Sequence, residues 1–261
     1  MIFKKFLKFL VPSYIWEKYI NKPPSTEHFL YKGVLDPKKD ILEKYGYDGD
    51  LVNLFSDNKD FLIHKWHHYF PIYEKYLAEY RNKKNLRFLE IGVAKGGSLQ
   101  LWRKFFGDEA TIFGIDIDPE CEKYNGIHAE VRIGSQIDKA FLKKTIDEMG
   151  GVDVILDDGS HHMNHIPHTL KYLFPKLSSG GIYMIEDLHT SFWRSYGGGY
   201  NSKGNFFNFL RILFSDMHHW YHREGAKFPE ISNECSGIYI HDSITVLEKK
   251  QIFPPVYSKI V

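Results

Sequence analysis

The sequence predicts an α/β fold: one mostly parallel sheet with helices on both faces, closed by an antiparallel hairpin near the C-terminal end. Three observations predict it. From residue 86 onward, short apolar runs alternate with stretches of helical periodicity, the pattern of a parallel sheet with crossover helices. A glycine-rich turn follows the first of these runs. Two final apolar runs flank a short polar turn, which predicts the hairpin.

The elements of this domain follow one another in a regular order. The strands are predicted at residues 86–91, 111–115, 129–133, 152–156 and 181–185. The intervening helices are predicted at 99–106, 138–149 and 165–177. The hairpin strands are predicted at 237–241 and 245–249, on either side of the turn formed by residues 241–243.

The first 85 residues are predicted to lie outside this domain. Phe3, Phe6, Leu7 and Leu10 recur at helical spacing within residues 1–25, with lysines on the other side. Such an amphipathic helix packs on its own domain or on a second subunit, or makes a peripheral contact with an anionic membrane. Paired prolines then resist helix continuation, and residues 26–85 are expected to form a helical cap. The main domain is predicted at 86–261, with a variable insert at 194–235.

Charge balance and cysteine count exclude several classes of protein. Lys and Arg number 34 against 33 Asp and Glu, so no global field attracts nucleic acid. Two cysteines are too few for a disulfide framework or a cysteine-based zinc site. Lysines interrupt the apolar N-terminal run and no small-residue cleavage site follows it, so no secretion signal is predicted. We expect a cytoplasmic homo-oligomer without a nucleic-acid partner.

The glycine-rich turn, LEIGVAKGGS at residues 89–98, predicts a site for an adenosine cofactor. Its glycines, Gly92 first, let the backbone approach a ligand. The turn lacks the glycine spacing of dinucleotide sites, and Glu90 would repel a pyrophosphate but suits a sulfonium or an amine. Asp116 ends the second strand, where an acid can bind the ribose hydroxyls. Ser135 and Gln136, after the third strand, are placed to meet the adenine.

Two acidic pairs end the fourth and fifth strands. The carboxyl ends of parallel strands meet at one crevice, so both pairs are expected beside the cofactor. Asp157 and Asp158 point to opposite faces and can serve different ligands. Asp158, Glu186 and Asp187 offer oxygen ligands that suit Mg²⁺ or Mn²⁺. The alternative is that these carboxylates cap helices or are solvated.

Four histidines follow the fourth strand, at positions 161, 162, 165 and 168. A zinc site among them is disfavoured, because no helical His-Glu motif or cysteine accompanies them and Pro167 interrupts the helix. One catalytic histidine beside the acids is more economical, since neutral imidazole can accept a hydroxyl proton near pH 7.

Several stretches together carry a family resemblance: LEIGVAKGGSLQLWRKFFG, GIDIDPEC, VRIGSQID, VILDDGSHH, GGIYMIEDLHTSFW and SGIYIHDSITVLEKK. With them the chain resembles the metal-dependent sugar O-methyltransferases of macrolide antibiotics and bacterial surface glycans. It is also similar to cephalosporin hydroxylase-like and rhamnosyl O-methyltransferase sequences. The resemblance covers residues 69–249 and implies the Rossmann-like fold of class I methyltransferases, with S-adenosylmethionine and Mg or Mn as cofactors.

The resemblance also implies roles for individual residues. Asp158, Glu186 and Asp187 would hold the metal, and His161 would be the general base. The residues expected around S-adenosylmethionine are Glu90, Gly92, Asp116 and Asp157. Tyr69 and Tyr73 belong to a segment that resembles the helix closing over the cofactor.

The expected function is methylation of a sugar hydroxyl. A cytoplasmic enzyme favours a nucleotide sugar for bacterial surface polysaccharide as the acceptor, with Lys203, Arg211 or Arg223 meeting its diphosphate. A sugar of a macrolide or another natural product is the first alternative. An Fe(II) hydroxylase that uses His161 with a carboxylate, and a non-catalytic glycan-binding module, are the others. Residues 194–200 are either a lid that excludes water or a plain loop.

Overall fold

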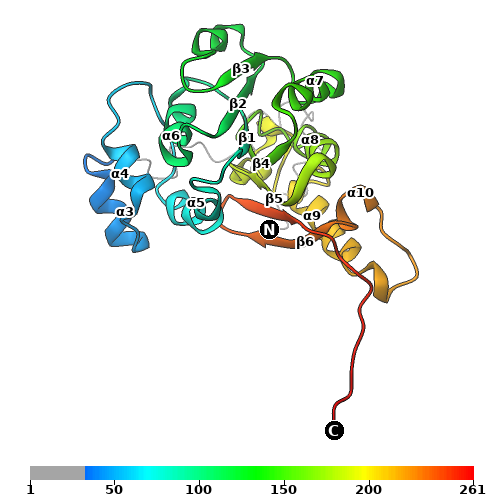
Figure 1. The fold of residues 1–261 in the computed structure, drawn as a ribbon. Helices are drawn as coiled ribbons and strands as arrows, with labels where there is room; N and C mark the ends of the chain where they lie inside the picture. Colours follow the sequence, from blue (N-terminus) through cyan, green and yellow to red (C-terminus); the bar gives the residue numbers. More distant parts are fainter. Residues whose placement is uncertain (1–32) are drawn as a thin grey trace, which may run out of the picture.

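The computed structural model describes residues 33–261, and within them seven strands form one sheet in the order β3-β2-β1-β4-β5-β7-β6. Figure 1 shows the sheet at the centre of the molecule. The helix predicted within residues 1–25 lies outside the described residues. The predicted fold class, a mostly parallel sheet with a C-terminal antiparallel hairpin, is confirmed.

Five parallel strands form most of the sheet. They are β1 (Arg87–Ile91), β2 (Thr111–Asp116), β3 (Glu130–Ile133), β4 (Val152–Asp157) and β5 (Leu177–Ile185). β7 (Thr245–Lys249) pairs antiparallel with β5, and β6 (Cys235–Ile240) pairs antiparallel with β7. Each strand matches a predicted one closely except β5, which begins at Leu177 rather than at residue 181. Its extra residues span an irregularity in the pairing with β4, because Leu177 pairs with Val152 and Ile182 with Val154.

The crossover helices lie where the apolar periodicity predicts them. They are α6 (Gly97–Phe106), α7 (Lys139–Met149) and α8 (Ile166–Leu173), and the 3₁₀ turns η4 (Pro119–Tyr124) and η5 (Phe174–Lys176) accompany them. Asp138 begins α7 because its carboxylate accepts hydrogen bonds from the backbone of Ala140 and Phe141. Gly150 ends α7 in the left-handed conformation at φ 73°.

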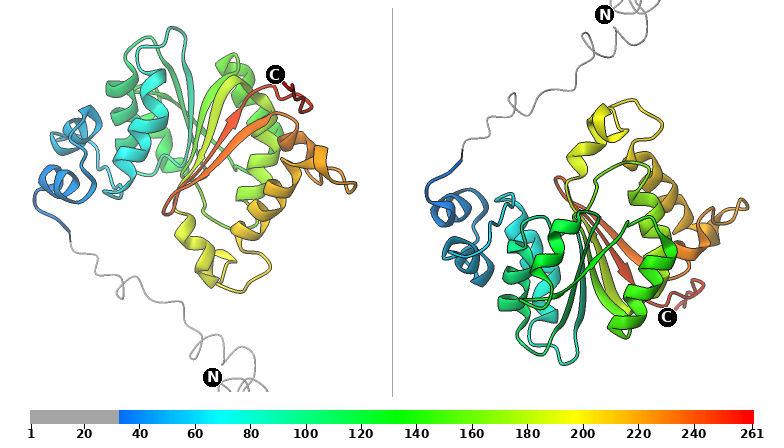
Figure 2. Two further views of the ribbon diagram at one scale, coloured as in Figure 1. Left: turned by 90° about the horizontal axis from the view of Figure 1, so that it is seen from below. Right: turned by 90° about the horizontal axis from the view of Figure 1, so that it is seen from above.

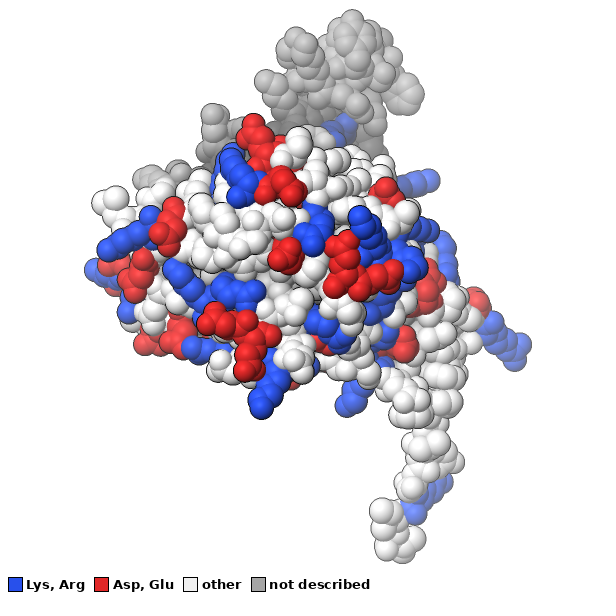
Figure 3. All heavy atoms as spheres, turned by 45° about the horizontal axis from the view of Figure 1, so that its top comes forward, with Lys and Arg blue, Asp and Glu red and all other residues white. Residues whose placement is uncertain are grey.

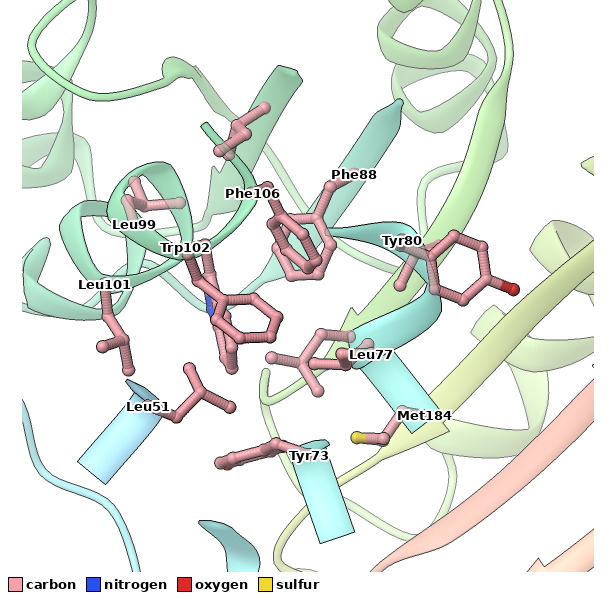
Figure 4. Close-up of a cluster of buried hydrophobic side chains, with 14 of the residues drawn as sticks. Leu51, Tyr73, Leu77, Tyr80, Phe88, Leu99, Leu101, Trp102, Phe106 and Met184 are labelled. Atoms are coloured by element: carbon pink, nitrogen blue, oxygen red, sulfur yellow. The ribbon is translucent and has the colours of Figure 1, made fainter. Parts of the chain in front are cut away.

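Two hydrophobic cores lie on opposite faces of the sheet, because successive strand residues point to opposite sides. Phe88 of β1 belongs to the core beneath α5 and α6, whereas Leu89 belongs to the core beneath α7 and α8. Figure 2 shows helices on both sides of the twisted sheet. Figure 4 shows the first core, where Trp102 and Phe106 of α6 pack around Phe88.

The described segment before the sheet is partly helical and does not form a core of its own. Its elements are α3 (Pro37–Tyr45), α4 (Asp50–Ser56), α5 (Tyr69–Leu77) and η3 (Ala78–Tyr80). Ile41, Leu51 and Tyr73 belong to the same hydrophobic cluster as Phe88. Residues 57–68, between α4 and α5, are not helical. They run past the carboxyl ends of the strands and supply part of the site.

The predicted variable insert folds onto the second core. It contains η7 (Arg194–Tyr196), α9 (Phe206–Asp216), η8 (His219–Tyr221) and α10 (Pro229–Ser232), and η6 (Leu188–Phe192) precedes it. Within residues 33–261, no helix has the length and apolar character needed to span a bilayer. Figure 3 shows positive and negative side chains interspersed on the face that it displays.

Candidate active site

The candidate site lies where the carboxyl ends of the parallel strands meet. Two adjoining cavities open there. The first is lined by residues that follow β2, β3 and β4, including Asp116 and Ser135. The second is lined by the segment before α5 and the ends of β4 and β5, including Lys65 and Asp158. Asp116 and Gly92 border both cavities, so the two are parts of one site.

Gly92 lets the turn after β1 approach the loop after β4. Its φ of 99° is a conformation that L side chains rarely adopt, and a Cβ atom there would collide with the carbonyl oxygen of Asp158. Both the backbone conformation and the close approach therefore require glycine. At Gly92, the border of the cavity therefore consists of backbone atoms alone.

Asp116 fixes the glycine-rich turn. Its Oδ2 accepts hydrogen bonds from the backbone N–H groups of Val93 (2.8 Å) and Ala94 (3.0 Å), and its Oδ1 accepts one from Asp118 (2.9 Å). Burial alone would raise the pKa of Asp116, but these amides lower it below its usual value. The carboxylate stays ionised at the border between the two cavities.

Gln136 builds the floor of the first cavity. Its Oε1 accepts a hydrogen bond from the backbone N–H of Ser160 at 2.7 Å, while its Nε2 donates to Asp157 at 3.3 Å and Thr169 at 3.2 Å. Ser135 beside it also lines this cavity. Both residues therefore lie where the sequence places them, although the amide group of Gln136 is already engaged with the protein.

Two predicted cofactor residues do not line either cavity. Glu90 is fully buried beneath the turn, where it accepts hydrogen bonds from Ser98 Oγ (2.8 Å) and Trp102 Nε1 (3.0 Å). Asp157 is buried on the other face of the sheet and accepts a hydrogen bond from Tyr183 at 2.8 Å. Burial raises the pKa of Glu90 to about 7 and that of Asp157 to about 6. In this structure both carboxyls support the site from below rather than contact its cavities.

Asp158, His161 and Asp187 come together in the second cavity. His161 Nε2 lies 3.8 Å from Asp158 Oδ1 and 3.8 Å from Asp187 Oδ2. One ligand atom from each of the three lies within 4.8 Å of the others. Two loops that are distant in sequence thus place two carboxylates and an imidazole around one point.

Glu186, which was predicted as a metal ligand, is bound to other protein groups in this structure. It is 1% exposed, its Oε2 accepts a hydrogen bond from Lys65 at 2.7 Å, and its Oε1 accepts one from Tyr73 at 2.6 Å. Burial and then Asp158 raise the pKa of Glu186 well above its usual range, against the opposing effect of Lys65. Of the three predicted ligands, only Asp158 and Asp187 turn a carboxylate oxygen toward His161.

Lys65 is a site residue that the sequence did not reveal. Its Nζ donates to Asp158 Oδ2 at 2.5 Å as well as to Glu186. Burial alone would lower the pKa of Lys65, but the neighbouring carboxylates raise it well above its ordinary value. The available signal is a single lysine in the aromatic and histidine-rich run 61–70, and nothing local indicates which residues it contacts.

Tyr69 and Tyr73 do not line either cavity, in contrast to the prediction that they contact the cofactor. From the first turns of α5, their hydroxyl groups reach the acids that follow β5. Tyr69 donates to Asp187 Oδ1 at 2.8 Å, and Tyr73 donates to Glu186. Trp66 Nε1 adds a second donor to Asp187 Oδ1 at 3.1 Å. Helix α5 and Trp66, which precedes it, therefore hold the side chains of Glu186 and Asp187 in place.

The backbone at the two central residues is strained. His161 has φ 52° and Asp187 has φ 54°, both in the left-handed region that non-glycine residues rarely adopt. Thr190 joins them, because its Oγ1 donates to the carbonyl oxygens of His161 (3.2 Å) and Asp187 (2.7 Å). Such conformations persist only where the surroundings fix them, and they concentrate at functional sites.

The other histidines of the predicted cluster are separated from the acids. His165 lines the first cavity, with Nδ1 2.9 Å from Ser160 Oγ. His162 packs against Gly197. Among the described residues, the group of Asp158, His161 and Asp187 is the one whose His, Cys, Asp and Glu side chains could hold a metal.

Aromatic rings continue from the acidic cluster toward the insert, and we call them the aromatic wall. The ring centroids of Trp66 and His189 are 5.4 Å apart, and those of His189 and Trp193 are 4.8 Å apart. Tyr196 follows at 5.9 Å from Trp193 and lies 6.4 Å from His161. The wall thus begins beside Asp187 and returns to His161.

Residues 194–200, predicted as a lid or a plain loop, are held by backbone hydrogen bonds. Gly198 N–H donates to Trp193 at 2.9 Å and Gly199 N–H donates to Ser191 at 2.8 Å. The carbonyl oxygen of Tyr196 accepts a hydrogen bond from Met163 at 2.8 Å. This ordered turn fixes Tyr196 in the aromatic wall.

Comparison with known families supports the fold. Residues 89–188, which contain the glycine-rich turn and the acidic cluster, match the family described as a methyltransferase domain. The chain carries a class I methyltransferase domain. The class I methyltransferase domain that the sequence motifs indicated is thereby confirmed.

Two relatives are O-methyltransferases by name, and the name of the first includes a rhamnosyl group. The chain is 33% identical over 217 residues to 8-demethyl-8-(2-methoxy-alpha-L-rhamnosyl)-tetracenomycin-C 3'-O-methyltransferase of Streptomyces olivaceus, covering 77% of this chain and 54% of that relative. It is 31% identical over 212 residues to demethylmacrocin O-methyltransferase of Streptomyces fradiae, covering 72% and 51%. The chain therefore spans about half the length of the curated relatives it matches.

A solved structure shares the fold. MycE methyltransferase from the mycinamycin biosynthetic pathway, in complex with Mg, SAH and mycinamycin VI, aligns with a TM-score of 0.66 at 25% sequence identity. The alignment covers 92% of this chain and 61% of that one.

Proposed function

We propose that this chain transfers a methyl group from S-adenosylmethionine to a hydroxyl of a sugar that is already attached to a natural product. The observation that carries the proposal is the position of His161 between Asp158 and Asp187, at the end of a two-part cavity. The names of the relatives, which are O-methyltransferases of rhamnosyl and macrolide compounds, support the reaction and the acceptor class.

This acceptor replaces the nucleotide sugar that the sequence favoured. The relatives named above act, by name, on tetracenomycin and demethylmacrocin, so they support the natural-product alternative instead. Lys203, Arg211 and Arg223, the predicted partners of a diphosphate, are exposed and line neither cavity.

The cofactor fits the two-part cavity with its adenosine in the first part and its sulfonium end toward the second. Ser135 and Gln136 line the adenosine part. Asp116, ionised at the border, lies where it can also accept hydrogen bonds from ribose hydroxyls. SAH in the MycE complex supports the same cofactor class.

The donor set fits a divalent cation. Lys65 pairs with Asp158 and Glu186, whereas Asp187 has no lysine or arginine partner among the described residues and its Oδ2 lies 3.8 Å from His161 Nε2. Asp158 Oδ1 and Asp187 Oδ2 would hold Mg²⁺ or Mn²⁺, both of which bind through one or two carboxylates and keep open positions. A bound cation would supply Lewis acidity that lowers the pKa of the acceptor hydroxyl.

The residues of the chain then perform the proton transfer and the positioning. His161 accepts the hydroxyl proton through Nε2 as the acceptor oxygen forms its bond to the methyl carbon and the carbon–sulfur bond breaks. The products are the methyl ether, S-adenosylhomocysteine and protonated His161. Tyr196 of the aromatic wall, whose ring centroid lies 6.4 Å from that of His161, would offer a surface for the apolar face of the sugar ring. Holding the reactants in line supplies much of the acceleration.

The donor set also separates this function from an Fe(II) hydroxylase. The common iron site of such enzymes uses two histidines and one carboxylate. Among the described residues, the group that could hold a metal has one histidine and two carboxylates. A non-catalytic glycan-binding module would not require His161 to be held in a strained conformation beside these acids.

Incubation with methyl-labelled cofactor tests the function. The acceptors are rhamnosyl tetracenomycin C, demethylmacrocin and mycinamicin VI, with a panel of nucleotide sugars alongside. We expect label in a glycoside and not in the nucleotide sugars. If label appears in the nucleotide sugars alone, the proposed acceptor class is wrong. If none of these sugars accepts label, the proposed reaction is wrong.

A further inference from the structure

Lys65 is the most deeply buried cationic group of the site. Its side chain is 3% exposed. It comes from the non-helical segment between α4 and α5, yet its Nζ lies between Asp158, which follows β4, and Glu186, which follows β5. A buried ammonium group is costly unless it is paired, so this position requires both carboxylates.

Lys65 contacts the carboxylate oxygens that do not face His161. Asp158 gives Oδ2 to Lys65 and turns Oδ1 toward His161. Glu186 gives one oxygen to Lys65 and the other to Tyr73. Lys65 thus leaves the open point between Asp158 and Asp187 accessible, but it engages Glu186 and places a positive charge beside that point.

We propose that Lys65 is a built-in cation that keeps the acidic cluster assembled before a divalent cation binds, and that its charge weakens the binding of that cation so that it remains exchangeable. Lys65 is in this sense a positioning residue: it acts through Asp158 and Glu186. The inference rests on the proposed function only in assuming that a divalent cation is used.

Two consequences follow from simple electrostatics. Without the ammonium group, the carboxyl groups of Asp158 and Glu186 lose their shared partner, so the cation-free protein loses stability. The same change removes a like charge from the neighbourhood of the cation and frees Glu186 Oε2 to approach it. The variant should therefore be less stable without the cation and should bind it more tightly.

The test uses the full chain with Lys65→Met, which keeps the length of the side chain without its charge. Titration with Mn²⁺, without cofactor or acceptor, should give a dissociation constant at least about tenfold lower than that of the wild type, because a unit charge a few ångströms away acts strongly in a partly buried site. The melting temperature in EDTA should be lower than that of the wild type and should rise more on addition of Mn²⁺.

Lys95→Met is the matched control, because Lys95 lines the same cavity but is exposed. Screening by solvent should limit its effect on the Mn²⁺ dissociation constant to about threefold. Equal or weaker Mn²⁺ binding by folded Lys65→Met would overturn the proposal. So would a failure of both the wild type and the variant to bind Mn²⁺, while methyl transfer would still be tested separately by the labelling experiment.

A second pair of variants applies if Lys65→Met does not fold. Glu186→Gln keeps a carbonyl acceptor for Lys65, and on this proposal it should weaken Mn²⁺ binding by clearly less than Asp187→Asn does, because Lys65 offsets the charge of Glu186 and holds its Oε2. Asp187→Asn should weaken binding by more than about tenfold, since it removes a charge that faces the cation directly. Equal losses in the two variants would show that Lys65 does not hold Glu186 away from the cation.

Discussion

At the scale of single residues, the two aspartates of the site divide their oxygens between two tasks. Asp158 uses one oxygen to bind Lys65, and Asp187 uses one to bind Trp66 and Tyr69. The other oxygen of each turns toward His161. The bound oxygen fixes the side chain, so the second oxygen is already oriented when ligands arrive, which is the arrangement that electrostatic catalysis requires.

His161→Ala should lower kcat by about 10²–10⁴-fold, the usual contribution of a positioned general base. Its affinity for S-adenosylhomocysteine should be unchanged within error, because His161 lines the second cavity and the adenosine part lies in the first. Single-turnover methyl transfer and calorimetry measure the two quantities. The control is His162→Ala, which should lose less activity; a larger loss than in His161→Ala would assign the base to the wrong histidine.

Asp116→Ala should weaken the binding of S-adenosylhomocysteine by at least about tenfold, because hydrogen bonds to a charged group that orders the turn are lost. The turn amides of Val93 and Ala94 lose their common acceptor. Calorimetry on the folded variant measures the dissociation constant. Asp118→Ala is the control, since its carboxylate caps η4 through Glu120 and lines neither cavity; similar losses in both variants would contradict the role of Asp116.

At the scale of elements, β1 and α6 form the unit that carries the cofactor turn. Glu90 of β1 binds Ser98 and Trp102 of α6, and the ring of Trp102 packs 5.5 Å from that of Phe88. A buried carboxyl group therefore joins the strand to the helix directly beneath the turn. The stability of this unit should depend on the protonation of Glu90.

Folding favours the protonated form of Glu90, because its pKa rises from the ordinary 4.5 to about 7 on burial. Its contribution to stability is therefore fully present below about pH 4.5 and is lost as the pH rises through about 7. Glu90→Gln resembles the protonated form at every pH. Between about pH 5 and pH 8 the melting temperature of the wild type should fall relative to that of Glu90→Gln, as measured by calorimetric melts. A constant difference across this range would mean that Glu90 does not titrate there.

At the scale of the whole molecule, the site depends on segments that are far apart along the chain. Lys65 and Trp66 come from before the sheet, and Asp187 comes from after β5. The two cores on either face of the sheet hold these segments in place. Ligands that contact several of these segments should therefore stabilise the folded molecule as a unit.

S-adenosylhomocysteine at about 100 times its dissociation constant should stabilise the protein by about 2.7 kcal/mol, which is a rise of roughly 5–10 °C in Tm for a chain of this size. Mn²⁺ should add a further rise that EDTA reverses, and EDTA should also abolish methyl transfer. Scanning calorimetry measures the shifts. Full activity in EDTA would show that methyl transfer does not need the cation. A larger shift in Tm with NAD than with S-adenosylhomocysteine would contradict the proposal that S-adenosylmethionine is the cofactor.

The sequence by itself determined the order of strands and helices and the edge of the sheet that carries the site. Apolar runs marked the strands because a buried parallel strand must be apolar on both faces. Asp158, His161 and Asp187 could be found because they directly follow such runs, and parallel strands bring their carboxyl ends to one edge. The hairpin of β6 and β7 was predicted from its polar turn.

The tertiary structure alone decided which way the polar side chains point and which partners they meet. Alternation along a strand shows that Asp157 and Asp158 face opposite sides, but not that Asp157 faces Tyr183 in the second core. Lys65 was not foreseeable, because it meets acids that are 93 and 121 positions away along the chain. Such contacts depend on the packing of α5 and the segment before it against the strand ends, and local sequence patterns carry no information about that packing.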